Sequence, residues 1–90
     1  MNIREVVKTE PNGLIAHAYA FAEKAHLGQK RSSGEPYFTH VLQTAQCLAD
    51  WHLDAQTVAA GLLHDTVEDT GVTMDDVKKE FGEEVTFLVD

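Results

Sequence analysis

The fold and the chemistry of this chain are decided by one stretch, Val58-Ala59-Ala60-Gly61-Leu62-Leu63-His64-Asp65-Thr66-Val67-Glu68-Asp69-Thr70. Its first half is an apolar run, and its second half sets four metal-binding or proton-handling side chains within six residues. In a helix, His64 and Glu68 share one face, with Asp65 and Asp69 one step round. An imidazole beside carboxylates suits a divalent metal such as manganese, iron or zinc. The second carboxylate pair is placed to handle protons or to position a water molecule.

The composition indicates one small globular domain. The chain has 90 residues, of which 43% are hydrophobic and 8% aromatic. No stretch is long enough to span a membrane, and the N-terminus lacks the apolar core of a signal peptide. The single cysteine, Cys47, has no partner for an internal disulfide, so we expect a reducing, cytoplasmic location.

The charge balance excludes general nucleic-acid binding. Seven basic residues against fifteen acidic residues give a net charge of −8, whereas binding to nucleic-acid backbones depends on Lys and Arg. A small anionic ligand remains compatible, because Lys24, Lys30 and Arg31 cluster while the acids concentrate from Glu68 onward. A bound dication would add to that positive charge.

Hydrophobic periodicity predicts an all-α fold, with no strand pattern and no internal repeat. The predicted helices cover roughly residues 13–27, 37–51, 55–70, 74–81 and 83 onward. Asn12, Asp54 and a Thr73–Asp76 capping box begin three of them, and residues 28–36 form a polar, basic loop. Residues 1–11 are either a short helix or a mobile arm, and residues 12–90 form the domain.

The near-continuous apolar half of helix 55–70 predicts that the other helices surround it. Buried positions are also expected for several larger side chains, namely Phe21, Cys47, Trp51, Phe81 and Phe87. Apolar residues still recur at helical spacing up to Asp90. This pattern predicts either a truncated domain, incomplete at its C-terminal end, or a last helix whose apolar face is covered by a partner.

The motifs in order resemble a known family. They are Gly28-Gln29-Lys30-Arg31, Ser33-Gly34-Glu35-Pro36-Tyr37, His40, Leu62 to Thr70, and Phe81-Gly82-Glu83-Glu84-Val85. Over residues 12–90 they resemble the HD-type hydrolase domain of the RelA/SpoT-homologue family, a helical bundle that holds one manganese ion. That domain degrades the alarmones ppGpp and pppGpp of the stringent response, releasing pyrophosphate from the 3′ position to give GDP or GTP.

The resemblance implies a role for eight residues. The metal ligands would be His40, His64 and Asp65, the catalytic carboxylates Glu68 and Asp69, and the substrate-binding residues Lys30, Arg31 and Ser33. The chain departs from the family pattern at Ser32, where many members carry a basic residue, and at Val41, where a proline is usual. The family's fourth metal ligand, an Asp on a later helix, and its synthetase region lie outside this sequence. The chain alone is therefore not expected to be a synthetase.

Simpler interpretations accompany these assignments. Taken alone, His40 could be a histidine at the start of a helix that bonds only to backbone. Glu68 and Asp69 could be a solvent-exposed helix end. Lys30 and Arg31 could be solvent-exposed charges of a loop. His17, His26 and His52 have no partner at a meaningful spacing and are interpreted as structural or surface residues. Two other functions remain open. One is a non-catalytic regulatory or self-associating HD fragment, in which formation of a homo-oligomer would cover the last helix. The other is an HD phosphohydrolase that acts on another nucleotide.

Overall fold

The computed structural model describes residues 2–89 and contains six helices in this range, which confirms the all-α class. They are α1 (Ile3–Thr9), α2 (Leu14–Ala25), α3 (Tyr37–Asp50), α4 (Ala55–Asp69), α5 (Met74–Phe81) and α6 (Glu83–Val89). The first eleven residues, left open between a helix and an arm, include α1, whose Ile3 is fully buried. The division of the chain at residue 12 remains a prediction.

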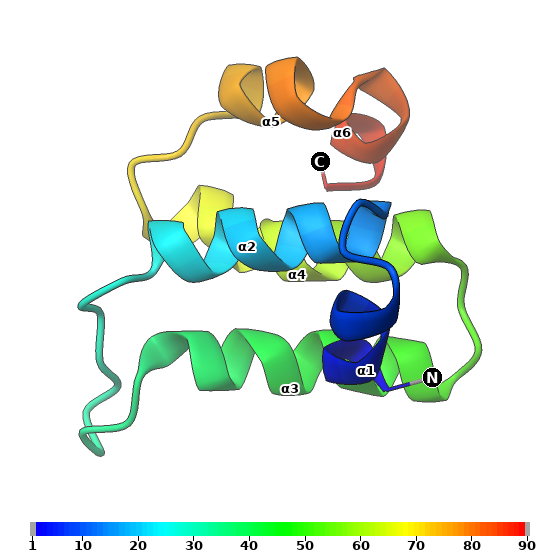
Figure 1. Cartoon of the computed structure of the whole chain (residues 1–90). Coiled ribbons are helices and arrows are strands. Elements are labelled where there is room, and N and C mark those ends of the chain that lie inside the picture. Colours follow the sequence, from blue (N-terminus) through cyan, green and yellow to red (C-terminus); the bar gives the residue numbers. More distant parts are fainter. Residues whose placement is uncertain (1, 90) are drawn as a thin grey trace.

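Helix α4 is the centre of the bundle. It packs against α2, α3 and α6, while α5 packs on α6 and α1 on α2. Figure 1 shows α2 and α4 lying between α3 on one side and the α5–α6 pair on the other. The apolar half of α4 supplies five fully or nearly fully buried side chains: Val58, Ala59, Ala60, Leu62 and Leu63. The predicted central position of this helix is thus confirmed.

Two of the three predicted helix starts are confirmed. The prediction that Asn12 caps α2 is wrong, because the N-cap is Gly13, which makes no side-chain cap hydrogen bond. The Asp54 carboxylate accepts a 2.8 Å hydrogen bond from the backbone N–H of Thr57 and so begins α4. Thr73 and Asp76 form the predicted capping box of α5. Gly82 ends α5 with a φ of 87°, a left-handed conformation that glycine adopts without steric cost.

Three expected core residues are exposed. Cys47 is exposed, Trp51 is 73% exposed and Phe87 is 82% exposed. Helix α3 buries Val41, Leu42, Ala45 and Ala49, so the row containing Cys47 and Trp51 faces away from the core. Helix α6 buries Val85 and Val89, four residues apart, and Phe87 between them points outward. The remaining two expected core residues, Phe21 and Phe81, are partly buried against the core, so the prediction of burial is correct in part for them.

Candidate functional site

One face of α4 carries a cluster of potential metal ligands. One ligand atom from each of His64, Asp65 and Glu68 lies within 4.8 Å of the other two. His64 Nδ1 is 3.4 Å from Asp65 Oδ1. His64 and Glu68 are exposed and Asp65 is half-buried, so the cluster is open to solvent on one side and supported by the apolar core on the other.

The composition and spacing of this cluster fit a divalent cation. Ligand atoms around an octahedral ion with bonds of roughly 2.1 Å lie roughly 3 to 4.2 Å apart. The distance of 3.4 Å between His64 Nδ1 and Asp65 Oδ1 falls in this range, and all three ligand atoms lie within 4.8 Å of one another. One imidazole and two carboxylates form a mixed donor set of the type that first-row divalent metals accept. A cavity of about 270 Å³ adjoins the cluster and has Gly61, His64, Asp65 and Leu88 on its wall.

Asp69, at the end of α4, is held by residues from elsewhere in the chain. The Tyr37 hydroxyl donates a 2.8 Å hydrogen bond to Asp69 Oδ2, and Gln29 Nε2 donates a 2.7 Å bond to the Asp69 carbonyl. The pKa of Tyr37 is raised, first by this hydrogen bond to Asp69, then by partial loss of water and by the negative charges of Asp69 and Asp65. The positive charge of Arg31 acts in the opposite direction on the Tyr37 pKa. Tyr37 therefore lies between the basic loop and the acidic end of α4.

His26 links the same region to the core. It is buried, and its Nδ1 lies 2.7 Å from Gln29 Oε1 while its Nε2 lies 3.1 Å from Thr66 Oγ1. Because Gln29 Oε1 can only accept, Nδ1 carries the hydrogen of this contact. The Thr66 hydroxyl also donates a 3.1 Å hydrogen bond to the Leu62 carbonyl within α4. The His26 ring also stacks on Tyr37, with centroids 5.3 Å apart. This contact fixes the start of α3 against the end of α2.

The loop between α2 and α3 is closed by its own backbone. Arg31 N–H donates to the Glu35 carbonyl and Gly34 N–H to the Arg31 carbonyl, each over 2.8 Å. Gly34 has a φ of 92°, which permits the reversal. Arg31 and Ser33 are exposed on this turn, so their side chains are accessible to a ligand.

The predicted site residues are brought together in part. His64, Asp65 and Glu68 cluster, and Asp69 is joined to Tyr37 and Gln29. His40 lies in the first turn of α3 and is not a member of the cluster; its ring packs against Tyr37 with centroids 5.8 Å apart. Lys30 lines a different cavity, between α2 and α3, instead of the one beside His64.

Three contributors were missed from the sequence. Tyr37 belonged to a quoted motif but had no role, Gln29 was treated as loop, and His26 was left without a partner. Their partners Asp69 and Thr66 lie 32 to 40 residues away in sequence. Thr66 was the available signal: it follows the buried apolar run of α4 and is itself buried, and a buried hydroxyl needs a hydrogen-bond partner.

Comparison with known proteins places these motifs in a family. The HD domain model matches residues 18–90. The chain is 49% identical over 84 residues, or 93% of its length, to a GTP pyrophosphokinase of Streptomyces coelicolor. It is 53% identical over 76 residues, or 84% of its length, to a probable guanosine-3′,5′-bis(diphosphate) 3′-pyrophosphohydrolase of Mycoplasma pneumoniae. It is 48% identical over 77 residues, or 86% of its length, to the GTP pyrophosphokinase rsh of Brucella melitensis.

The chain spans 10% of the length of each of these relatives, so it corresponds to a small part of each of them. In the part of the chain that the structure describes, no helix combines the length and the apolar character needed to cross a membrane. The match to the domain model extends over most of the chain, and the matched region contains both the α4 cluster and the Tyr37–Asp69 contact. This chain belongs to the HD-domain family, among the RelA/SpoT homologues.

Proposed function

We propose that this chain carries part of a metal-dependent hydrolase centre that acts on ppGpp and pppGpp, releasing pyrophosphate from the 3′ position to leave GDP or GTP. One observation supports this function most directly: the α4 cluster of His64, Asp65 and Glu68 lies in the helix whose last residue, Asp69, is oriented by Tyr37. The name of the Mycoplasma relative, a probable pyrophosphohydrolase for this class of nucleotide, agrees with it.

The metal ligands in this proposal are His64, Asp65 and His40, with manganese as the ion. His64 and Asp65 already lie close together, whereas His40 has to turn from its contact with Tyr37 to join them. A divalent cation, when bound, supplies a Lewis acid and lowers the pKa of water. The remaining chemistry falls to side chains of this chain.

Glu68 and Asp69 are the proposed proton-handling pair. Asp69 uses Oδ2 to accept from Tyr37, which leaves its Oδ1 to accept a hydrogen bond from a water molecule. The raised pKa of Tyr37 keeps its hydroxyl protonated, so the hydroxyl remains a donor to the carboxylate. A carboxylate held in this way is already oriented for general base chemistry.

The basic loop supplies the complementary charge for a polyanionic nucleotide. Arg31 and Ser33 are exposed on the turn, and the Arg31 charge acts on Tyr37, so the loop and the carboxylates face a common region. A guanidinium binds phosphate oxygens through two parallel hydrogen bonds. Lys30 contributes long-range attraction in this proposal, because its side chain lines the neighbouring cavity.

The test is calorimetric titration of the metal-free 90-residue chain with Mn²⁺, combined with an assay for pyrophosphate released from ppGpp. We expect saturable binding that Asp65→Ala abolishes and that Asp75→Ala, a substitution of an exposed carboxylate on α5, leaves unchanged. Equal Mn²⁺ affinity in Asp65→Ala and the parent would show that the α4 site is wrong. Metal binding without release of pyrophosphate would favour a non-catalytic role for this polypeptide.

A self-associating fragment is the second candidate, and one observation favours it. Phe87 is 82% exposed and Leu88 44% exposed on α6, and Leu88 adjoins the cavity beside His64 and Asp65. Sedimentation analysis tests this function: a dimer that Phe87→Ser dissociates supports it, and a monomer at all concentrations contradicts it.

A cytoplasmic location remains our expectation, because Cys47 is a free, exposed thiol that suits a reducing compartment.

A further inference from the structure

A second cavity lies away from the α4 cluster. It has a volume of about 580 Å³, compared with about 270 Å³ for the cavity beside His64. Arg4 from α1, Lys24 from α2 and Phe38 from α3 are on its wall, and Arg31, Ser33 and the three clustered α4 residues are not. Volumes of about 300 to 1,000 Å³ are typical of sites for small molecules.

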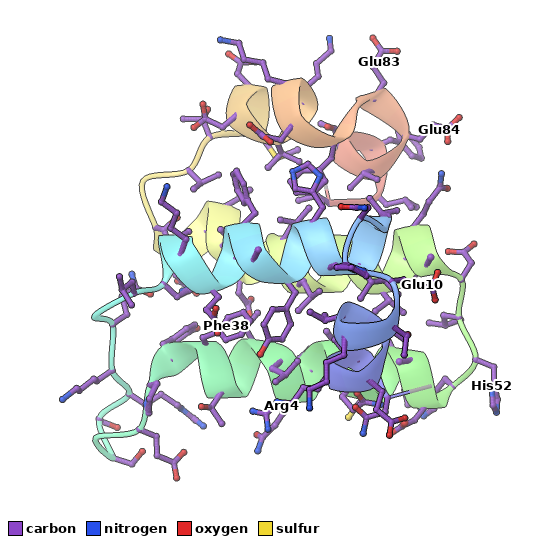
Figure 2. The ribbon with its side chains drawn as sticks, in the orientation of Figure 1. Arg4, Glu10, Phe38, His52, Glu83 and Glu84 are labelled. Atoms are coloured by element: carbon purple, nitrogen blue, oxygen red, sulfur yellow. The ribbon has the colours of Figure 1, made fainter. Side chains whose placement is uncertain are left out.

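The inner wall of this cavity is apolar and partly aromatic. Tyr19 and Phe38 meet edge to face, with ring centroids 5.0 Å apart, and Leu42 lies beside them. Figure 2 shows Phe38 in the space between α2 and α3. Leu27 lines the cavity and is 82% exposed, so a large apolar side chain is uncovered there. This wall matches the apolar body of a ligand.

The cavity is also lined by cationic residues on a strongly acidic chain. Arg4, Lys24 and Lys30 line it, and Glu23 is the one acidic residue among its lining residues. The chain has only seven basic residues against fifteen acidic ones, so three of the seven gather here. None of these three forms an ion pair among the residues that the structure describes. Figure 2 shows Arg4 projecting from α1 beside α3.

We propose that this cavity binds a small amphipathic anion, a compound with an aromatic or aliphatic body and one carboxylate, sulfonate or phosphate group. The body lies against Tyr19, Phe38 and Leu27, and the anionic group pairs with Arg4 and Lys24. Unpaired cations beside an apolar wall provide both the attraction and the orientation for such a ligand.

The cavity shares a wall with the acidic end of α4. His26 and Gln29 both line it, and they hydrogen-bond to Thr66 Oγ1 and to the Asp69 carbonyl, respectively. A bound ligand therefore contacts the two side chains that hold this end of α4. We expect the backbone amide signals of Gly28 and Gln29 to shift when the cavity fills.

The first test compares two fluorescent probes that share an aromatic body. One is 1-anilinonaphthalene-8-sulfonate, which carries a negative charge, and the other is neutral N-phenyl-1-naphthylamine. We expect the sulfonate to bind more tightly, and Lys24→Glu to weaken its binding by roughly fivefold or more. The matched control is Lys79→Glu, which makes the same charge change on exposed α5, and it should shift affinity by less than roughly twofold. Arg4→Glu serves as the second cavity variant. Equal effects of Lys24→Glu and Lys79→Glu would overturn the proposal.

The second test locates the probe by nuclear magnetic resonance. Saturable amide shifts at Gly28 and Gln29 support the proposal, whereas shifts confined to Phe87 and Leu88 on α6 contradict it. Leu27→Ser should weaken binding of the sulfonate probe, and Phe87→Ser, an equally exposed apolar residue, should not. Because Leu27, Lys24 and Arg4 are all exposed, circular dichroism should show native helix content in each variant.

Discussion

The Tyr37 hydroxyl donates a 2.8 Å hydrogen bond to Oδ2 of Asp69, across 32 residues of sequence. This bond ties the first residue of α3 to the last residue of α4. It also places a residue that follows the basic loop against the carboxylate proposed to handle protons. The orientation of Asp69 is therefore set by a contact between helices and not by α4 alone.

Asp69→Asn should lower the pKa of Tyr37 toward its ordinary value. The carboxylate accepts the phenolic hydrogen and its charge opposes ionisation, so these two causes of the raised Tyr37 pKa weaken in the variant, while partial loss of water and the charge of Asp65 remain. Because the folded-state pKa is the higher one, the stability from this contact is complete below the ordinary pKa of about 10 and is lost as pH rises through the folded-state value. Ultraviolet absorbance of tyrosinate measures the titration. Asp75→Asn is the control, and an unchanged curve in Asp69→Asn would mean that the hydrogen bond is absent in solution.

Glu68→Gln should leave Mn²⁺ binding within roughly threefold of the parent, whereas Asp65→Asn should weaken it by more than roughly tenfold. Glu68 lies close enough to His64 and Asp65 to be a ligand, but the family resemblance assigns it to catalysis. The two substitutions remove one negative charge each from the same helix face, so long-range attraction falls equally in both. Calorimetry separates the roles, and a matching loss in both variants would make Glu68 a ligand.

His26→Ala should destabilise the fold by about 2 to 4 kcal/mol. The change leaves a cavity where the buried ring was and removes the hydrogen-bond partner of Gln29 Oε1, while the Thr66 hydroxyl keeps its bond to the Leu62 carbonyl. Urea denaturation followed by circular dichroism measures the loss. His52→Ala is the control: Figure 2 shows this side chain pointing outward from the turn after α3, and its effect should stay within about 0.5 kcal/mol.

Gly61→Ala should give no gain in stability on its own, although alanine favours a helix over glycine by about 1 kcal/mol. A Cβ at this position would lie 2.5 Å from Cδ1 of Leu48, so the leucine side chain has to move. In a Leu48→Ala background the obstruction is gone, and Gly61→Ala should then stabilise by about 1 kcal/mol. A double-mutant cycle in urea measures this coupling. Additive effects would mean that α3 and α4 pack less closely at this point.

The sequence by itself determined the all-α class, the five helices from α2 to α6 and the family. Asp54 and the Thr73–Asp76 box begin α4 and α5 through hydrogen bonds that span only three residues, so their outcome depends on neighbours in the chain. The apolar half of α4 likewise predicted its central place, because a helix without a polar face has to be covered. The order of the motifs predicted the family, which the HD domain match over residues 18–90 and the similarity to the three relatives together confirm.

Only the tertiary structure decided which side chains meet and which face of a short helix is buried. Trp51 and Phe87 have the composition of core residues, yet the packing of α3 and α6 turns them outward. The Tyr37–Asp69 and His26–Thr66 contacts join segments 32 and 40 residues apart. A local sequence pattern contains no information on contacts between such distant segments, because these contacts depend on how α2 and α3 each pack against α4.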